Sequence, residues 1–465
     1  MALERPPVLA ACAYADSWLS FRAVHDRVPG IQAAVLLGDE VLLSSAHGVA
    51  DVGAGTALTA AHRFRIASHS KTFTATAVMQ LATSGALRLD DPVGHWVGEL
   101  DRHPVGAVTL RELLAHGGGV IRDGWDGDHW QLVRPFPDAA TLRAIAADDA
   151  QVLARNERFK YSNVGYALLG AVIEAVTGTS YADHVTATLL GPLGLDATSP
   201  EIDLADTSDH ATGYTALAYA PRRIPFDHIA TGAMAAATGF SSTATDMVRW
   251  AAAHFSGDER ILSDDAKRQM QRTEWTVIGS AGEYGLGFGI GKLGERRVLG
   301  HGGGFPGFAT RTWFDPVDRL AVSVLTNVVD GPALALANGI VKLIDLAAGS
   351  GALPCDLAAY TGRFAGPWGV TDIAALGSSL YALDPTLDDP VETAQRLEVV
   401  DDDTLRIAEA PGYGSPGERY VFSRDGDGRI RSVRGGSGTT ALPLESFQAL
   451  LASQERIRLG IELLP

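Results

Sequence analysis

The chain has 465 residues, which is too long for one ordinary domain and indicates two or three. Its 46% hydrophobic and 20% charged residues are typical of a globular protein and exclude a disordered one. The formal net charge of −17 argues against binding to nucleic acid or to an anionic membrane, since both need basic patches that displace counterions.

Cys12 and Cys355 lie far apart and outside any C-x-x-C pattern, which argues against a disulfide framework or a zinc–thiolate centre. No apolar run reaches the roughly 18 residues of a membrane-spanning helix. The start of the chain lacks the basic and apolar regions of a signal peptide. We therefore expect a soluble, cytoplasmic protein.

Residues 31–50 predict two apolar strands joined by a hairpin at residues 38–40. A helix is predicted over residues 69–84, because apolar side chains recur at every fourth position and Gly85 follows. Similar patterns predict further helices over residues 109–116, 163–178, 243–255 and 331–348.

Strands are predicted over residues 297–300, 309–314 and 319–326, with a turn at residues 315–318 joining the last two. Strands therefore stand at both ends of residues 1–348, with helices between them. We expect the two ends to pair into one antiparallel sheet with helices packed on it, an α+β arrangement. A catalytic cleft would then lie between this layer and the helical segment of about residues 90–240.

The composition changes at residues 349–354, GSGALP, which predicts a domain boundary between residues 1–348 and residues 355–465. Short strands separated by Asp- and Gly-rich turns predict a small all-β barrel in the second domain. These strands are predicted over residues 378–383, 396–400, 404–408, 418–423 and 429–434.

Ser68 and Lys71, in the stretch RIASHSKTF, stand where the predicted helix 69–84 begins. Only five of the 38 basic residues in the chain are lysines, so a lysine at this point is notable. Positions three apart share a helical face, which brings the Lys71 amine over the Ser68 hydroxyl. A serine paired with an amine at the positive end of a helix is a candidate nucleophile; the alternative is an ordinary solvated helix.

Tyr161 and Asn163, in the stretch FKYSN, form a second polar pair. A phenol can relay protons, and an amide can hold a substrate carbonyl. The structural alternative is a tyrosine packed at a turn, with Asn163 as the N-cap of helix 163–178. Asn163 can serve both roles.

Residues 300–308 read GHGGGFPGF and follow a predicted strand, where glycines let the backbone approach a substrate closely. Residues 302–307 match G-x-G-x-x-G formally. The residues that follow predict a strand and not the helix that a dinucleotide site requires, so we reject such a site. A lipase fold is rejected as well, because the chain has no G-x-S-x-G nucleophile elbow.

The three motifs S-x-x-K, Y-x-N and H-G-G, found together in this order, indicate a protein family far more specifically than any one of them alone. The chain resembles the serine β-lactamase and penicillin-binding-protein superfamily, in its class C-like branch, which includes esterases and D-aminopeptidases. Three further stretches resemble this family: TLRELLAHGGG (109–119), LLGPLGLDAT (189–198) and GFSSTATDMVRW (239–250). The resemblance covers roughly residues 20–345. Some members carry a lipocalin-like C-terminal domain, which residues 355–465 would suit.

The resemblance implies a role for each residue of the first two motifs. Ser68 would be the acylated nucleophile, and Lys71 would help to deprotonate it. Tyr161 would shuttle protons in acylation and deacylation, which requires positive charge nearby because the pKa of a free tyrosine is about 10. Asn163 would orient Lys71 and the substrate.

The resemblance also implies that the backbone N–H groups of Ser68 and Gly304 form an oxyanion hole, with Gly302 and Gly303 beside the substrate. His301 stands where penicillin-recognising members carry the lysine of Lys-Thr-Gly. A histidine is mostly neutral at pH 7, so selection for an anionic β-lactam or a C-terminal D-Ala carboxylate is weakened. This departure favours esters, or amides without a carboxylate beside the reacting bond.

Other residues have weaker signals. His69 lies one helical step away from Ser68 and is expected at the surface. His116 is expected to pack near the site or to cap its helix. Four aromatic residues in long irregular segments are candidates for a pocket wall: Trp125, Trp130, Tyr214 and Tyr219.

We therefore expect a serine hydrolase that forms an acyl-enzyme on Ser68 and cleaves an ester or an amide, as an esterase or a D-aminopeptidase-like amidase. Acyl transfer to an alcohol or amine is a variant of this reaction. The alternatives are a β-lactamase or D-alanyl-D-alanine carboxypeptidase, and a non-catalytic binding protein on the same fold. The chemistry requires no metal or organic cofactor. A homo-oligomer stays open, with the C-terminal domain as a candidate to narrow the cleft or mediate dimers.

Overall fold

A computed structural model describes residues 3–279, 282–350, 357–436 and 438–453. The chain forms two compact units: Arg27–Ala337, and Met1–Asp26 together with Asn338–Pro465. The first unit contains an antiparallel sheet with helices, and the second contains a closed antiparallel barrel of eight strands. The predicted fold class is therefore confirmed.

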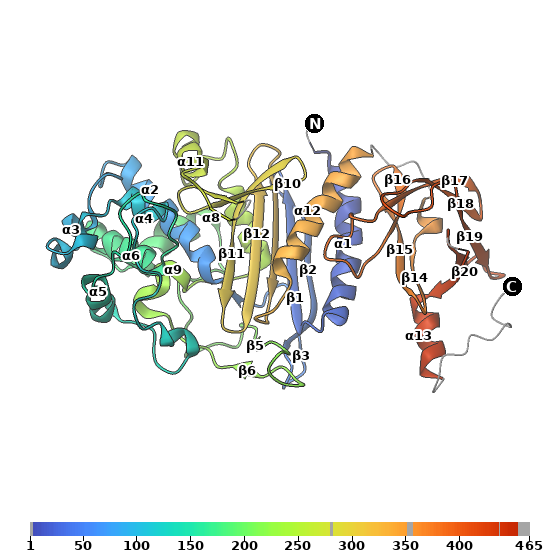
Figure 1. The fold of residues 1–465 in the computed structure, drawn as a ribbon, viewed down its shortest axis with the longest axis horizontal. Helices are drawn as coiled ribbons and strands as arrows, with labels where there is room; N and C mark the ends of the chain where they lie inside the picture. The colour runs from blue at the N-terminus through green and yellow to red at the C-terminus, as the bar shows by residue number, and fades with distance from the viewer. Residues whose placement is uncertain (1–2, 280–281, 351–356, 437, 454–465) are drawn as a thin grey trace. The chain divides into compact units, whose positions relative to one another are not determined.

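The sheet of the larger unit has the strand order β3-β2-β1-β13-β12-β11-β10-β9-β8 (Figure 1). β1 pairs with β13, with Val35 opposite Val322, so the two ends of this unit meet inside one sheet as predicted. The strands are β1 (Gly30–Leu37), β2 (Glu40–Asp51), β3 (Thr56–Ala57), β8 (Trp275–Thr276), β9 (Glu283–Tyr284), β10 (Gly289–Leu293), β11 (Arg296–Phe305), β12 (Phe308–Asp315) and β13 (Leu320–Thr326).

Strand β11 is longer than predicted, because it continues through the glycines of the third motif. Its pairing with β12 runs on to Phe305 opposite Phe308, whereas its pairing with β10 ends at Gly300 opposite Gly289. Residues 301–305 therefore form a stretch of strand whose edge is open on the β10 side within the described part of the sheet.

Helix α2 (Ser70–Thr83) lies in the core of the larger unit, and each of its residues from Ser70 to Met79 is buried. The ring of Phe73 stacks on Phe240 and Trp250, with centroids 4.4 and 3.9 Å apart. A helix buried on all sides has little freedom to move, so it fixes the residues at its N-terminus.

Further helices surround α2 or cover the sheet. α10 packs on β1, β12 and β13, and α6 and α9 lie beside α2. The helices of this unit, besides α2, are α3 (Val93–Trp96), α4 (Leu110–Leu114), α5 (Ala139–Ala147), α6 (Asn163–Thr177), α7 (Tyr181–Val185), α8 (Gly191–Leu193), α9 (Ala235–Thr238), α10 (Ala244–Ala252) and α11 (Asp264–Gln271).

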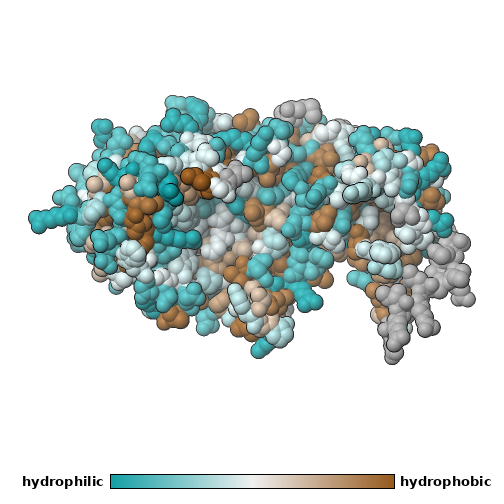
Figure 2. Space-filling view, viewed as in Figure 1, coloured by the Kyte–Doolittle hydropathy of each residue, from teal (hydrophilic) through white to brown (hydrophobic). Residues whose placement is uncertain are grey.

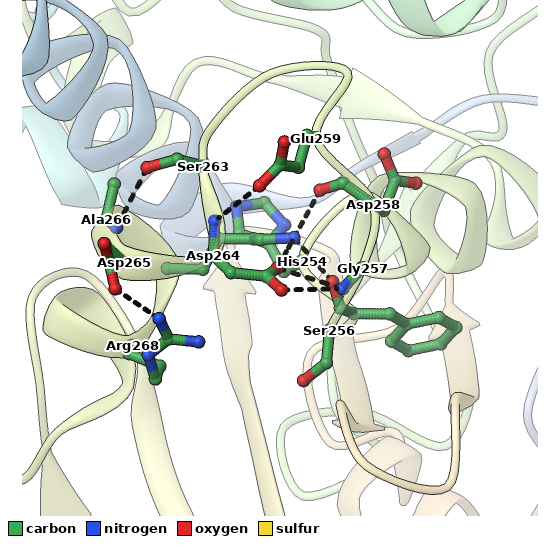
Figure 3. A network of polar contacts seen from close by, with 12 residues as sticks. His254, Ser256, Gly257, Asp258, Glu259, Ser263, Asp264, Asp265, Ala266 and Arg268 are labelled. Atoms are coloured by element: carbon green, nitrogen blue, oxygen red, sulfur yellow. Dashed lines mark hydrogen bonds and ion pairs between the residues drawn. The ribbon is translucent and has the colours of Figure 1, made fainter.

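The loop between α10 and α11 is held by polar contacts to the start of α11 (Figure 3). The backbone N–H of Gly257 donates to both carboxylate oxygens of Asp264, at 2.9 and 3.1 Å. The buried Lys267 of α11 pairs with Asp264 at 2.8 Å and donates to the carbonyls of Phe255, at 2.6 Å, and Asp258. This network stabilises the loop through contacts local to it.

The smaller unit begins with α1 (Arg5–His25), a helix that the sequence patterns did not reveal. Pro6 and Pro7 stand in its first turn, where the missing N–H groups cost no intrahelical bond. Tyr14 on α1 donates to Asp372 at 3.0 Å, and Trp18 donates to the carbonyl of Pro385 at 3.0 Å. These contacts fix α1 to the barrel region of the same unit.

The barrel is closed by eight strands in sequence order and carries a helix, α13 (Leu444–Ala452), against β14 and β21. The five predicted strands are confirmed as β16 to β20, whereas β14, β15 and β21 were missed. The strands are β14 (Gly362–Gly366), β15 (Gly369–Leu376), β16 (Ser379–Leu383), β17 (Gln395–Asp401), β18 (Thr404–Glu409), β19 (Arg419–Arg424), β20 (Ile430–Arg434) and β21 (Thr440–Pro443).

The face of the molecule drawn in Figure 2 is mostly hydrophilic, and hydrophobic residues occur there in small, separate patches. Among the helices of the described residues, none has both the length and the apolar character needed to cross a membrane.

Candidate active site

Ser68 lies in a single 3-10 turn, Ala67–His69, directly before α2. Ala67 has a φ of +49°, a left-handed conformation that is strained for a residue with a Cβ. Ala67, His69 and Ser70 are buried, whereas Ser68 is partly exposed. The turn therefore presents the Ser68 hydroxyl at the positive end of a rigid helix.

The amine of Lys71 is fully buried and donates three hydrogen bonds. It reaches Ser68 Oγ at 3.2 Å, Asn163 Oδ1 at 2.7 Å and the carbonyl of Ala237 at 2.8 Å. Burial lowers the pKa of Lys71 well below its ordinary value, and the nearby carboxylate of Asp123 opposes part of that effect. An amine with a lowered pKa can act as a base at neutral pH.

Tyr161 reaches the same serine from the other side, and its hydroxyl donates to Ser68 Oγ at 2.8 Å. The Lys71 Nζ lies 4.8 Å from the centre of the Tyr161 ring. Burial raises the pKa of Tyr161, whereas its hydrogen bond to Ser68 and the charge of Arg122 lower it. The serine hydroxyl therefore has two proton acceptors within reach once either has given up its own proton.

Asn163 is the first residue of α6, but it is not the N-cap as the sequence suggested. That position belongs to Ser162, whose hydroxyl accepts from the N–H of Gly165 at 2.8 Å. The Asn163 side chain is free for the site: Oδ1 accepts from Lys71, and Nδ2 donates to Asp123 Oδ1 at 2.6 Å. Asn163 thus contacts Lys71 as expected.

The third motif lies against the turn that carries Ser68, because β11 packs on residues 67–69. Gly303 approaches the backbone of Ile66 so closely that a Cβ would lie 2.1 Å from the Ile66 carbonyl oxygen and 2.5 Å from Thr310 Oγ1. Gly304, the next residue, has open space where a Cβ would be. Gly303 therefore sets the distance between β11 and the serine turn.

A Cβ has no room at Gly303 but open space at Gly304, so alanine substitutions at these two positions form a matched pair of variants. Gly303→Ala is expected to destabilise the protein by about 1–3 kcal/mol or more, because either the strand or the serine turn must move. Gly304→Ala is expected to keep wild-type stability. Thermal unfolding of both variants, together with the rate of covalent labelling by a fluorophosphonate, tests the expectation. Equal melting temperatures for the two variants would contradict it.

His301 is buried, with both ring nitrogens engaged. Nδ1 lies 2.6 Å from the carbonyl oxygen of Gly302, which only accepts, so Nδ1 carries the proton. Nε2 lies 3.2 Å from the hydroxyl of Tyr284. Burial lowers the pKa of His301 well below its ordinary value, and Lys71 lowers it further. The residue is therefore neutral, which agrees with the argument made from its type alone.

Two other histidines lie behind the site. His116 accepts from the N–H of Ser162 at 3.1 Å, and its ring lies 4.3 Å from that of Tyr161. His69 was expected at the surface, but that prediction is wrong: it is 1% exposed, and its Nδ1 lies 2.9 Å from the carbonyl oxygen of Ile66. His69 turns inward because residues 67–69 form a 3-10 turn packed under β11, so the helical geometry used for the prediction does not apply.

Of the four aromatic residues expected to wall a pocket, Trp130 lies near the site. Its Nε1 donates to Asp123 at 2.8 Å, and its ring lies edge-on to Phe305, with centroids 5.9 Å apart. Trp125 and Tyr219 are exposed, and Tyr214 is buried in a short strand.

Sequence reasoning missed Asp123, Tyr284 and the carbonyl of Ala237. Each contacts a motif residue from a distant part of the chain, and none belongs to a motif of its own. A weak signal for Asp123 existed, since an Arg-Asp-Gly turn follows the H-G-G-G of residues 116–119. No group of three or more His, Cys, Asp or Glu side chains that could hold a metal is found within the described part of the chain.

Residues 19–345 match the Beta-lactamase family. The chain therefore belongs to the beta-lactamase family. The match covers the same stretch over which the motifs and neighbouring sequences resembled this superfamily.

Among curated proteins, the chain is similar to "Penicillin-binding protein 4*" of Bacillus subtilis, with 27% identity over 295 residues. That alignment covers 59% of this chain and 62% of the relative. It is also 30% identical to "Protein flp" of Staphylococcus aureus over 190 residues, which are 40% of this chain and 38% of the relative. The chain thus spans less than two thirds of the length of these relatives.

Among solved structures, SurE is 26% identical, with a TM-score of 0.63, and the match covers 94% of this chain and 99% of SurE. A D-stereospecific amidohydrolase from Streptomyces sp. is 27% identical, with a TM-score of 0.59, over 68% of this chain and 94% of that one. An octameric penicillin-binding protein homologue from Pyrococcus abyssi, at 24% identity and a TM-score of 0.67, shares the fold over 90% of this chain and 97% of its own.

Proposed function

We propose that this protein forms an acyl-enzyme on Ser68 and cleaves an amide or ester whose carbonyl belongs to a D-configured amino acid. Ser68 Oγ attacks the carbonyl carbon and gives its proton to the Lys71–Tyr161 pair. The pair then protonates the departing amine or alcohol as its bond to the carbonyl carbon breaks. Water, activated in the same way, releases the acid and restores the serine.

The observation that carries this proposal is the double contact at one oxygen. Ser68 Oγ lies 3.2 Å from the Lys71 amine, which is buried, and 2.8 Å from the Tyr161 hydroxyl. A protein that only binds a ligand has no need of a buried amine against a partly exposed serine, since burying an amine is unfavourable. The open edge of β11 beside this serine leaves the N–H of Gly304 available as an oxyanion donor.

Two features favour a D-amino acid amide or ester over a β-lactam. His301 is neutral and has both nitrogens engaged, so it offers no cation for a carboxylate beside the reacting bond. Among the solved structures, one similar protein is a D-stereospecific amidohydrolase, and SurE has been solved with D-Leu. We extend this D-configured chemistry to the present chain as part of the proposal.

A substrate panel tests the proposal. The enzyme is incubated with D- and L-phenylalanine amide, a p-nitrophenyl ester and benzylpenicillin, and each is followed by product release and by intact mass. We expect turnover of the D-amide or the ester, and at least about tenfold preference for D over L, which corresponds to roughly 1.4 kcal/mol. Faster turnover of benzylpenicillin than of either would replace the proposal with the β-lactamase alternative.

The same panel addresses the remaining alternatives. If no reagent labels the folded protein, the hydrolase proposal fails and a binding role on the same fold replaces it. If labelling occurs but an added amine collects the acyl group instead of water, the reaction is acyl transfer. Cytoplasmic location and assembly into a homo-oligomer stay predictions.

A further inference from the structure

Arg122 and Asp123 form a charged pair beside the proposed catalytic residues, and neither belongs to the three motifs. The carbonyl of Arg122 accepts from the N–H groups of Asn163, at 2.8 Å, and Val164, at 3.1 Å. This contact ties the backbone of the pair to the N-terminus of α6. The two charges are therefore held at a fixed distance from Asn163.

The carboxylate of Asp123 determines how the Asn163 amide lies. Asp123 Oδ1 accepts from Asn163 Nδ2 at 2.6 Å and from Trp130 Nε1 at 2.8 Å. A reversed amide would place its oxygen against this carboxylate and its nitrogen against the Lys71 amine, and both contacts would be repulsive. Asp123 thus holds Asn163 Oδ1 toward Lys71.

Arg122 lies over the other proposed base. Its guanidinium carbon is 5.5 Å from the centre of the Tyr161 ring, and its Nε is 3.2 Å from Asp123 Oδ2. The side chain is 66% exposed, so this charge is in contact with solvent. Arginine stays protonated at any working pH, which makes Arg122 a permanent cation at this position.

We propose that Arg122 and Asp123 are positioning residues that set the charge state of the Lys71–Tyr161 pair: Asp123 orients Asn163 against Lys71, and Arg122 favours the form of the pair that has lost a proton. This inference rests on the proposed function, because it assumes that the pair activates Ser68. It adds two residues that the motifs do not contain.

The other groups around Tyr161 do not supply such charges. Tyr161 is surrounded by His116, which follows α4, and by Tyr166, Tyr284 and His301 on α6, β9 and β11. Burial favours the neutral form of each. Arg122 lowers the pKa of both Lys71 and Tyr161, whereas Asp123 raises both. Because both effects have the same sign on the two bases, their consequence does not depend on which base takes the proton.

The test is the pH dependence of labelling by a fluorophosphonate, whose rate follows the fraction of activated serine. Arg122→Gln removes a cation, so the ascending limb of the plot of labelling rate against pH is expected to move to higher pH by about half a unit. Asp123→Asn keeps an oxygen that can accept from Asn163 and Trp130 but removes the anion, so the limb is expected to move to lower pH. The double variant should return close to wild type, since the two charges cancel.

Three controls separate charge from structure. Arg122→Lys keeps the cation, so the ascending limb of its pH profile should lie close to that of the wild type. Arg268→Gln, at a 67% exposed arginine that pairs with Asp265 on α11, should leave it unchanged. Added salt should shift the pH profile of the wild type toward that of Arg122→Gln, because salt screens the exposed charge of Arg122.

The outcomes distinguish this inference from the proposed function. The inference is overturned if Arg122→Gln and Asp123→Asn are labelled but their ascending limbs do not move, or move in the same direction. Ser68 then remains the nucleophile. A wild-type protein that is not labelled at any pH overturns the proposed function, and the inference with it.

Discussion

Ser68→Ala is expected to abolish covalent labelling by a fluorophosphonate and to lower kcat/KM for the best substrate of the panel by about 10⁴-fold or more. The variant keeps Lys71 and Tyr161 in place but removes the oxygen that both contact, at 3.2 and 2.8 Å. Intact-mass spectrometry of the treated protein measures the adduct directly, and initial rates measure the loss.

The matched control is Ser84→Ala, at an exposed serine that caps the other end of the same helix. This variant should be labelled at the wild-type rate, which shows that the reagent does not react with serines in general. An adduct on folded Ser68→Ala would show that another residue is the nucleophile, and the proposed function would need a different centre.

Lys71→Met is expected to lower the labelling rate and kcat by about 10³-fold, which is the range for losing a general base. Its melting temperature should change by only a few degrees. The substitution leaves Asn163 Oδ1 and the Ala237 carbonyl without their donor, but it also removes an amine whose pKa is lowered by burial. These two effects oppose each other, because burying an amine is itself unfavourable.

Lys267→Met is the matched control, since Lys267 is also a fully buried lysine but lies on α11. It donates to the carbonyls of Phe255 and Asp258, and losing these bonds should lower the free energy of unfolding by about 2–3 kcal/mol. Its labelling rate should stay at the wild-type level. If the two variants instead lost activity and stability in parallel, Lys71 would be a structural residue.

The sequence was sufficient to predict the residues that share a local pattern. Ser68 and Lys71 are three positions apart at a helix start, a spacing that predicted their contact, and the amine lies 3.2 Å from the hydroxyl oxygen. The pairing of the first strand with the last followed from apolar strands at both ends of one domain, and β1 does pair with β13. The family resemblance rested on motifs in the right order, and residues 19–345 match the Beta-lactamase family.

Predictions failed where pairing overrides local preference. Glycines disfavour a strand, yet β11 runs through residues 301–305, because its partner β12 supplies the hydrogen bonds. The barrel strands β14 and β15 contain or adjoin glycines, and β21 ends at Pro443, so each is a weak strand on its own. Closure of the barrel supplies the pairing that these short segments lack.

The sequence by itself therefore determined the fold class, the family and the identity of the polar residues at the motifs, since these depend on patterns within short stretches. The tertiary structure alone decided which distant residues meet them. Tyr161 reaches Ser68 across 93 positions of the chain, and Asp123 reaches Asn163 across 40. Tyr284 reaches His301 from another strand. Such contacts depend on how helices and strands pack, which no local spacing encodes.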